Sequence, residues 1–283
     1  MATGLSSYTE GGLGVRRVGQ LALPSYLSVV FQTRELQEEM LSNCPHLEDP
    51  YLAEALNHWL SSCGPVPPPG RMSSQAAWDE MLIREDKAQV SNYSTSPREK
   101  AIFLAASFPH SGDWLSALPL ASCGLRLYDE AIRVGVALRL GTPLCSPHDC
   151  RCGAKVDPWG THAFTCKKAP GRIMGHHALN DIVARALTTA EKPVHKEPPG
   201  LMSASGKRPD GISLLSWKNG KRVAWDVTVA TTLADSYLAA SSSRCGSAAS
   251  LISARKDAKY QGLPAEYMFY PLAFENLGPT SAE

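Results

Sequence analysis

Residues 207–229 read KRPDGISLLSWKNGKRVAWDVTV, and this stretch decides the fold of the second half of the chain. Two short apolar runs, residues 212–215 and 223–225, lie on either side of Asn219-Gly220, a dipeptide typical of tight β-hairpin turns. The pattern predicts two antiparallel strands joined at this turn. An acid stands at the outer end of each run, Asp210 in one strand and Asp226 in the other. We therefore expect the hairpin to bring two carboxylates to neighbouring positions.

Paired carboxylates of this kind favour a cation site. Like charges held close together repel, so such a pair commonly binds a divalent cation or has a raised pKa. Asp210 and Asp226 therefore predict a hydrolytic metal site. The ordinary alternative is a turn aspartate at 210, between Pro209 and Gly211, and a strand-end carboxylate at 226 that pairs with a lysine.

A second group of metal-ligating residues precedes the hairpin. Cys150 and Cys152 are followed after nine residues by His162, and after three more by Cys166. Four soft ligands at this spacing predict a small tetrahedral zinc site. Because four protein ligands leave no open position for a substrate, we expect a structural role. Cys145 could replace Cys150 or Cys152, and the ordinary alternative is a loop with reduced thiols and a surface histidine.

The charge is distributed unevenly along the chain. The net charge of the 283 residues is only +1, but residues 1–144 carry −4, residues 145–260 carry +8 and residues 261–283 carry −3. The basic segment contains both acids of the hairpin, as expected of a site that meets a polyanion. A solvated lysine-rich surface would give the same count. Four basic residues near the cysteines are candidates to contact phosphates: Arg151, Lys155, Lys167 and Lys168.

Composition places the chain among soluble globular proteins, with 43% hydrophobic and 19% charged residues. No run of eighteen apolar residues occurs, so we expect no membrane span and no membrane partner. The N-terminus lacks the basic and then apolar order of a secretory signal. The expected location is therefore intracellular, in the nucleus or the cytoplasm.

The order of these features resembles one family, the C-terminal region of non-LTR retrotransposon proteins of the restriction-like endonuclease clade. Members carry a helical segment, then a Cys-Cys-His-Cys zinc knuckle, then a nuclease of the PD-(D/E)xK superfamily. The resemblance covers roughly residues 75–262. Its matching residues here include the four zinc ligands, Glu197-Pro198, residues 207–210, residues 225–229, and Lys256 through Tyr260.

The resemblance implies an α+β or α/β fold, with an N-terminal helical module, a zinc knuckle and a mixed β-sheet flanked by helices. Composition, helical periodicity and the resemblance together divide the chain into five parts: an irregular arm with short helices and a Pro-rich linker over 1–72 (irregular to residue 25), a helical module over 73–144, the knuckle over 145–170, the endonuclease domain over 171–270 and a tail over 271–283. The sequence also favours a third strand, or a loop, over residues 231–238.

The resemblance further implies the site residues. Asp210 matches the first acid and Asp226 the second, and together they would hold Mg²⁺, while Glu197 matches an upstream acid. The superfamily places a lysine two positions after the second acid, and this chain has Thr228 there. Lys256 and Lys259, from the helix that follows, are the candidate catalytic lysines.

The implied function is metal-dependent nicking of DNA for target-primed reverse transcription, with structural Zn²⁺ and catalytic Mg²⁺. DNA is the expected partner, with the element's RNA as a second one. No Tyr/Phe-x-Asp-Asp run occurs, so the chain resembles a tail detached from the polymerase. Two other functions remain open: an inactive nucleic-acid-binding relic, favoured by Thr228, and a protein-interaction module built on the N-terminal helices.

Overall fold

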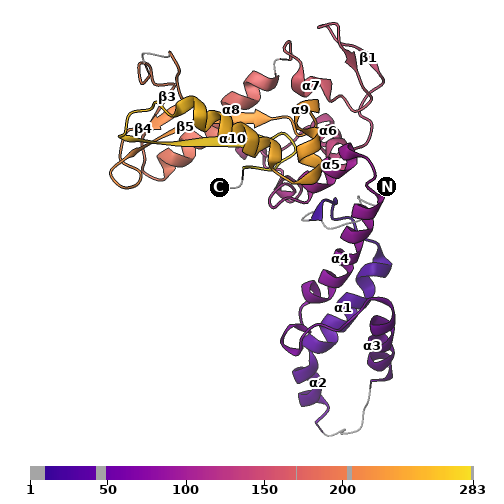
Figure 1. Cartoon of the computed structure of the whole chain (residues 1–283). Helices are drawn as coiled ribbons and strands as arrows, with labels where there is room; N and C mark the ends of the chain where they lie inside the picture. The colour runs from indigo at the N-terminus through magenta and orange to yellow at the C-terminus, as the bar shows by residue number, and fades with distance from the viewer. Residues whose placement is uncertain (1–9, 43–48, 170, 203–205, 282–283) are drawn as a thin grey trace. The chain divides into compact units, whose positions relative to one another are not determined.

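The computed structural model describes residues 10–42, 49–169, 171–202 and 206–281. Within these residues the chain contains ten α-helices and two small sheets, so the expected mixture of helices and sheet is confirmed. The chain divides into two compact units, Met1–Ser94 and Thr95–Glu283 (Figure 1). This division falls within the helical module expected over 73–144 and not at its boundaries.

The first unit is helical and is organised around two tryptophans. Trp59 and Trp78 pack edge to face, with ring centroids 4.9 Å apart, against the fully buried Leu27. Each indole N–H donates to a loop carbonyl, that of Trp59 to Pro65 (3.2 Å) and that of Trp78 to Met72 (2.7 Å). The Pro-rich linker is thereby fixed to the core. The helices are α1 (Val18–Gln32), α2 (Arg34–Met40), α3 (Pro50–Ser62), the 3₁₀ turn η3 (Pro69–Arg71) and α4 (Gln75–Tyr93).

Two expectations for this unit need correction. The irregular arm predicted up to residue 25 is wrong from Val18 onward, where α1 begins. The helical module predicted to begin at residue 73 is also divided, because α4 belongs to the first unit. Both differences have one cause: Leu27 of α1 and Trp78 of α4 are distant in sequence but share a core. Residues 1–9 of the predicted arm lie outside the described residues.

The second unit begins with a well-defined helix start. The Ser96 side chain accepts a hydrogen bond from the Glu99 backbone N–H (3.1 Å), and the Glu99 carboxylate accepts one from the Ser96 N–H (3.0 Å). This capping box satisfies N–H groups that a helix start leaves unpaired. The helices of this unit are α5 (Pro97–Ala106), α6 (Asp129–Leu140), α7 (His162–Thr165), α8 (Gly171–Thr189), α9 (Asp235–Ser243) and α10 (Ser247–Tyr260), with 3₁₀ turns η4 (Asp113–Leu115) and η5 (Ala121–Cys123).

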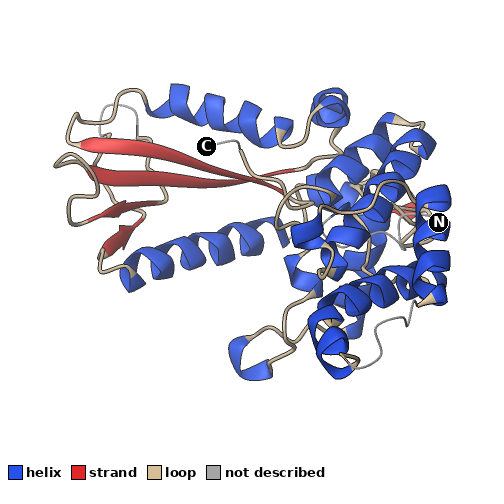
Figure 2. Ribbon diagram, turned by 90° about the horizontal axis from the view of Figure 1, so that it is seen from below, coloured by secondary structure: helices blue, strands red, loops and turns tan. Residues whose placement is uncertain are grey.

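The main sheet of the second unit has the order β3-β4-β5-β6. Its strands are β3 (Val194–Lys196), β4 (Gly211–Ser213), β5 (Arg222–Ala230) and β6 (Tyr267–Glu275). The first two pairs are antiparallel and the last is parallel. Val223, Trp225 and Val227 pack with Ala184 of α8 on one face, and α10 covers the other (Figure 2). A separate two-stranded sheet pairs β1 (His148–Asp149) with β2 (Lys155–Val156).

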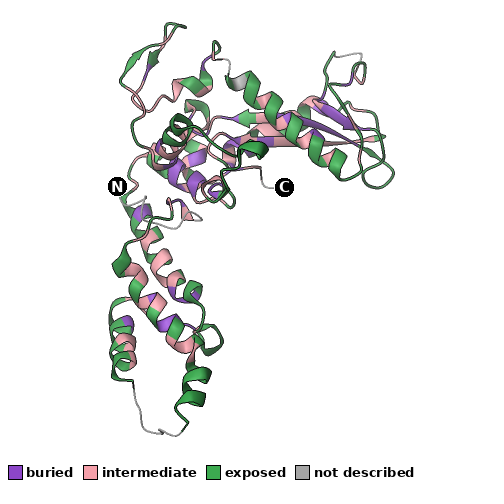
Figure 3. Cartoon of the chain, turned by 180° about the vertical axis from the view of Figure 1, so that it is seen from behind, coloured by how far each residue is buried: buried purple, intermediate pink, exposed green. Residues whose placement is uncertain are grey.

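The predicted hairpin is confirmed. Asn219 (φ 53°) and Gly220 (φ 74°) both adopt the left-handed conformation, as a two-residue type I′ turn requires. Lys218 and Lys221 form the closing bridge on either side of them. β4 and β5 then pair in antiparallel register, and their buried residues appear purple in Figure 3.

The register of this hairpin fixes the two acids. Gly211 lies opposite Trp225, so Asp210 and Asp226 are the next residues outward on their two strands. A one-residue slip would move one of the acids to the opposite face of the sheet. The observed pairing therefore places both at one end of β4, as expected.

The strand β6 was not predicted and replaces most of the expected tail. The tail over 271–283 is corrected, because β6 continues to Glu275. Of the strand and the loop considered over 231–238, the structure has the loop, which leads into α9. Pro271 argues against a strand at this position in the sequence, because proline has no backbone N–H to donate to a neighbouring strand. β6 is the last strand of the sheet, and an edge position tolerates this proline.

Glu275 at the end of β6 connects the sheet to α10. Its carboxylate is almost fully buried (4% exposed) and accepts hydrogen bonds from the backbone N–H groups of Ala248 (3.0 Å) and Ala249 (3.3 Å). The other carboxylate oxygen accepts the hydroxyl of Thr232 (2.8 Å). A carboxylate at a helix N-terminus is favourable because of the exposed N–H dipoles. This contact holds α10, with Lys256 on it, against the sheet.

We expect Gly211→Ala to destabilise the second unit by about 2 kcal/mol, as overpacking does. A Cβ at this position would lie 2.1 Å from Cζ2 of Trp225, whose ring is itself buried. Urea denaturation followed by circular dichroism would measure the loss. Gly175→Ala is the matched control, because a Cβ added at Gly175 would have no other atom within 4 Å. Equal midpoints for the two variants would contradict this packing.

Candidate active site and metal centre

Asp210 and Asp226 line one pocket of about 1050 Å³. The pocket lies at the N-terminal end of β4, where Gly211 forms the last pair with β5. From there β5 continues from Asp226 to Ala230 without pairing with β4. The remaining walls come from α7 and the residues that follow it, the first turns of α8 and the last turns of α10. Their side chains include Phe164, Lys167, His176, Lys256 and Lys259.

Asp210 is held in place by three neighbours. Its Oδ2 accepts a hydrogen bond from the Val227 N–H (2.6 Å) and lies 3.0 Å from Nε2 of His176. The Asn180 side chain donates to the Asp210 backbone carbonyl (3.3 Å) and accepts the Trp225 indole N–H (2.8 Å). Within the described part of the chain, Oδ1 of Asp210 has no hydrogen-bond partner. One carboxylate oxygen is thus oriented by the protein and the other is available to a ligand.

Asp226 is more deeply buried, at 4% exposed, and its carboxylate has more partners. Lys256 pairs with Oδ1, and Lys259 lies 3.6 Å from Oδ2. The Tyr260 hydroxyl lies 2.6 Å from Oδ2, and the Thr228 hydroxyl lies 3.5 Å from Oδ1. The ordinary alternative for residue 226, a carboxylate paired with a lysine, therefore describes this contact. The two acids do not require a cation for charge balance.

Tyr260 fixes the geometry around Asp226. The pKa of the Tyr260 hydroxyl is raised mainly by burial and further by the hydrogen bond to the Asp226 carboxylate, so the hydroxyl stays protonated. The same hydroxyl lies 2.6 Å from the Arg208 carbonyl and accepts from Nζ of Lys259 (2.8 Å). Tyr260 thereby ties α10 to the segment that precedes Asp210.

His176 and Tyr260 were not predicted as site residues. The spacing of Lys256 and Tyr260, four residues apart on one helix, could have indicated that both face the same group. No comparable signal exists for His176, which the fold of α8 brings to Asp210 from 34 residues away.

Glu197 does not join the two aspartates. Its carboxylate is exposed and pairs with Arg208 (2.8 Å), while its backbone N–H donates to the Asp210 carbonyl (2.9 Å). Glu197 is absent from the lining of the pocket. Its backbone supports the strand that carries Asp210, and its side chain lies elsewhere.

The four predicted zinc ligands converge. The ligand atoms of Cys150, Cys152, His162 and Cys166 all lie within 4.8 Å of one another, so the group could hold a metal ion. The sulfurs of Cys150 and Cys166 are 3.8 Å apart, and Sγ of Cys152 is 3.1 Å from Nε2 of His162. A tetrahedral site with metal–sulfur bonds of ~2.3 Å has edges of about 3.8 Å. The spacing of the two sulfurs thus fits such a site.

Two further observations define the ligand set. Cys145, left open as an alternative, lies 3.4 Å from the Asp157 carbonyl and outside the converging group. The backbone N–H of Ala154 and the neighbouring ligand side chains lower the pKa of Cys152 to about 6. Thiolates are the metal-binding form of cysteine. In the described part of the chain no second group of three His, Cys, Asp or Glu side chains converges in this way.

The metal-ligand cluster adjoins the pocket through α7. Phe164, on the helix that begins at His162, lines the pocket, and its carbonyl accepts the Thr231 hydroxyl (3.3 Å). Of the four basic residues predicted to contact phosphates, Lys167 lines the pocket. Lys155 instead pairs with Asp149 (2.7 Å), and Lys168 donates to the carbonyl of Arg151 (3.1 Å).

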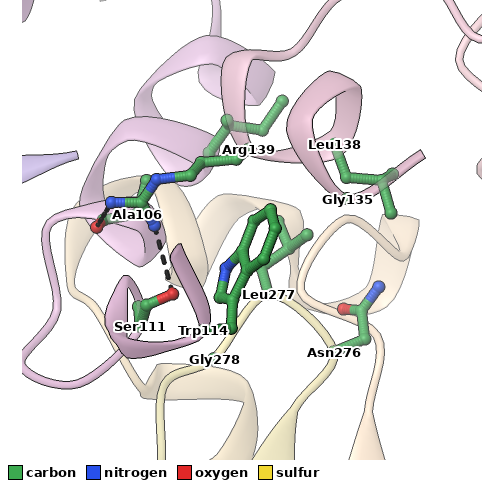
Figure 4. Close-up of a pocket in the computed structure, with 10 residues that line it drawn as sticks. Ala106, Ser111, Trp114, Gly135, Leu138, Arg139, Asn276, Leu277 and Gly278 are labelled. Atoms are coloured by element: carbon green, nitrogen blue, oxygen red, sulfur yellow. Dashed lines mark hydrogen bonds between the residues drawn. The ribbon is translucent and has the colours of Figure 1, made fainter. Parts of the chain in front are cut away.

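A smaller pocket of about 220 Å³ lies between α5, α6 and the residues that follow β6 (Figure 4). Arg139 is buried there and donates to the carbonyls of Ala106 (3.0 Å) and Ser111 (3.2 Å). Burial lowers the pKa of its guanidinium. These contacts join α6 to the end of α5 and give Arg139 a structural role.

A scan against models of protein families gives no match for this chain, and a search of curated protein sequences gives none either. None of the helices in the described ranges combines the length and the apolar character needed to cross a bilayer. The family resemblance therefore rests on the residues of the chain itself.

Proposed function

We propose that the protein is a metal-dependent DNA endonuclease with a restriction-like fold, derived from the C-terminal region of a non-LTR retrotransposon protein. The observation that carries the proposal is the meeting of Asp210, Asp226 and Lys256 in one pocket. The three residues come from the position before β4, from β5 and from α10. They have the side-chain types that phosphodiester hydrolysis uses.

The order of the elements supports the restriction-like fold. An antiparallel hairpin carries both acids, a parallel strand follows, and a helix covers each face of the sheet. The acids lie at the N-terminal end of β4, beyond which β5 has no pairing with β4 along that edge. An open strand edge of this kind admits a polymer, whereas an enclosed cavity would not.

Asp210 and Asp226 are the residues that would hold Mg²⁺. The chemistry supplied at such a site is a lowered pKa of bound water and stabilisation of charge on the phosphate. The unpartnered Oδ1 of Asp210 fits this use. The protein's own part is to hold that carboxylate in one orientation through Val227 and His176.

Lys256 and Lys259 are the proposed source of positive charge beside the scissile phosphate. Thr228 stands where the superfamily has its lysine, and its hydroxyl lies near the same Asp226 oxygen that Lys256 contacts. An ammonium group from α10 thereby occupies the neighbourhood that a lysine at position 228 would reach. Its charge favours a phosphate and stabilises the charge that develops on it.

We propose zinc as the metal of the cysteine–histidine cluster. Three thiolates and one imidazole are typical ligands of structural zinc, and all four positions are filled by protein. The cluster's role is to hold α7, which contributes Phe164 to the wall of the pocket.

Nicking of supercoiled plasmid by the purified protein tests the proposed function. We expect conversion to the open circle with Mg²⁺ or Mn²⁺ and none with EDTA. Failure of both ions to support nicking, in protein that is folded and contains zinc, would reject the endonuclease.

One observation favours a second function, binding of nucleic acid without cleavage. Asp226 is already paired with Lys256, Lys259 and Tyr260, so a cation would have to compete for it. A binding protein of this kind would show salt-dependent affinity for DNA but give no metal-dependent product in the plasmid assay.

We expect His176→Ala to reduce the nicking rate by about 10- to 100-fold, as loss of a residue that orients a metal ligand does. Its imidazole lies 3.0 Å from Asp210 and holds the carboxylate through Oδ2. His177→Ala is the matched control, since His177 is exposed and does not line the pocket. Initial rates under saturating Mg²⁺ would measure both. Equal rates for the two variants would show that Asp210 does not depend on His176.

A further inference from the structure

The loop between β4 and β5 is exposed throughout, and we call residues 214–222 the hairpin tip. Leu214, Leu215 and Trp217 lie in it, and all three are exposed, Trp217 at 44%. Of the chain's six tryptophans it is the exposed one; the others are buried or half-buried. Exposed apolar side chains that lie close together in one loop are a feature of surfaces that bind a partner.

The hairpin tip is also basic. It contains Lys218, Lys221 and Arg222 and no acid. Across the described residues none of these three forms an ion pair. Arg222 instead lies over the ring of Tyr267, 6.0 Å from its centroid. Uncompensated cations beside exposed aromatic and aliphatic groups are the composition of surfaces that bind nucleic-acid strands.

The hairpin tip is held in one conformation. The Ser213 hydroxyl donates to the Leu215 carbonyl (2.7 Å) and accepts the Val223 N–H (3.0 Å). The Trp217 N–H donates to the Lys221 carbonyl (2.7 Å) across the turn. A surface fixed before binding loses little conformational entropy when it binds.

We propose that the hairpin tip binds DNA that flanks the scissile phosphate, with Trp217 stacked on an unpaired base and Lys218 and Lys221 against phosphates. The inference rests on the proposed function for its choice of DNA. Arg222 and Asp226 lie on one strand and are separated by ~13 Å at the usual rise of a strand. This is about four base pairs of duplex, so one DNA molecule can reach from the pocket to the hairpin tip.

An anionic membrane is the other surface that a tryptophan, two leucines and lysines would fit. DNA is favoured because further basic groups of the same unit lie in the pocket, including Lys167 and Lys259. Binding to a phospholipid surface would not account for these basic groups in the pocket.

The test is binding of a short labelled duplex that carries an unpaired single-stranded flank, without added Mg²⁺, where no cleavage is expected, measured by fluorescence anisotropy. We expect Trp217→Ala to weaken binding by about tenfold, the loss typical of one base stacked on an aromatic side chain. Trp217→Phe should retain most of the affinity, and Tyr128→Ala, which removes a still more exposed ring (85% exposed), should retain all of it. Replacing Lys218 and Lys221 by alanine should reduce the slope of log affinity against log salt concentration by the equivalent of roughly two phosphate contacts.

Tryptophan fluorescence gives an independent readout. Because Trp217 is the exposed tryptophan, DNA should quench emission in the wild-type protein and much less in Trp217→Ala. Wild-type affinity in Trp217→Ala, together with wild-type salt dependence in the variant that lacks Lys218 and Lys221, would overturn the inference. So would binding of vesicles containing phosphatidylserine that depends on Trp217 while DNA binding does not.

The two proposals can fail separately. Trp217-dependent DNA binding without metal-dependent nicking would reject the endonuclease and keep the hairpin tip. Metal-dependent nicking combined with a DNA affinity that does not depend on Trp217 would keep the endonuclease and reject the hairpin tip as a DNA-binding surface. Circular dichroism of each variant checks that the fold is intact, and the phenylalanine variant keeps the ring if alanine unfolds the loop.

Discussion

Asp210→Asn is expected to reduce plasmid nicking by about a thousandfold or more while leaving DNA affinity close to that of the wild type. Loss of a metal ligand removes several kcal/mol of charge stabilisation in the transition state, and each ~1.4 kcal/mol is tenfold in rate. Asparagine keeps the shape of the side chain and can still accept the Val227 N–H. The variant should therefore fold normally and bind DNA.

The matched control is Asp181→Asn. Asp181 lies on α8, is exposed and pairs with Lys196 outside the pocket. Initial nicking rates and anisotropy with the same DNA would be measured for both variants. Wild-type nicking by Asp210→Asn would show that this carboxylate holds no catalytic cation.

Asp226→Asn should also abolish nicking, but it is a less selective change. Its carboxylate is buried and pairs with Lys256 and Lys259, so the neutral amide leaves two ammonium groups without their anion. Breaking a buried ion pair by changing one partner destabilises the fold. We expect a lower melting temperature for this variant, and for that reason Asp210→Asn carries the argument about catalysis.

Cys152→Ser and His162→Ala are expected to lose the bound metal and to lower the melting temperature by more than about 5 °C. A structural zinc site contributes roughly 10 kcal/mol or more to the folding of a small domain, and only part of that loss would appear in a unit of this size. The loss should also disturb α7 and with it the wall of the pocket that Phe164 forms.

Cys145→Ser is the control for these variants. Cys145 is a nearby free cysteine whose sulfur lies against the carbonyls of Asp157 and Pro158, outside the ligand group. Elemental analysis should give one zinc per chain in the wild type and in Cys145→Ser, and less in Cys152→Ser. One zinc per chain in both ligand variants would mean that the metal lies elsewhere. A metal other than zinc in the wild type would correct its proposed identity.

The sequence by itself determined the local features. Asn219-Gly220 can form a two-residue turn because both residues accept positive φ, and this fixed the hairpin and the neighbouring positions of Asp210 and Asp226. The spacing of Cys150, Cys152 and His162 likewise lies within a single short segment, so their convergence could be predicted. In each case the deciding interaction spans few residues.

Only the tertiary structure decided the rest. β6 was missed because Pro271 argues against a strand, and an edge position that tolerates it cannot be seen in the sequence. His176 reaches Asp210 from another element, and the ammonium groups of Lys256 and Lys259 compensate the charge of Asp226. Glu197, expected among the acids of the site, instead forms an ion pair with Arg208. Such contacts depend on how distant helices pack on a sheet, and side-chain burial and charge compensation are set only when that packing is complete.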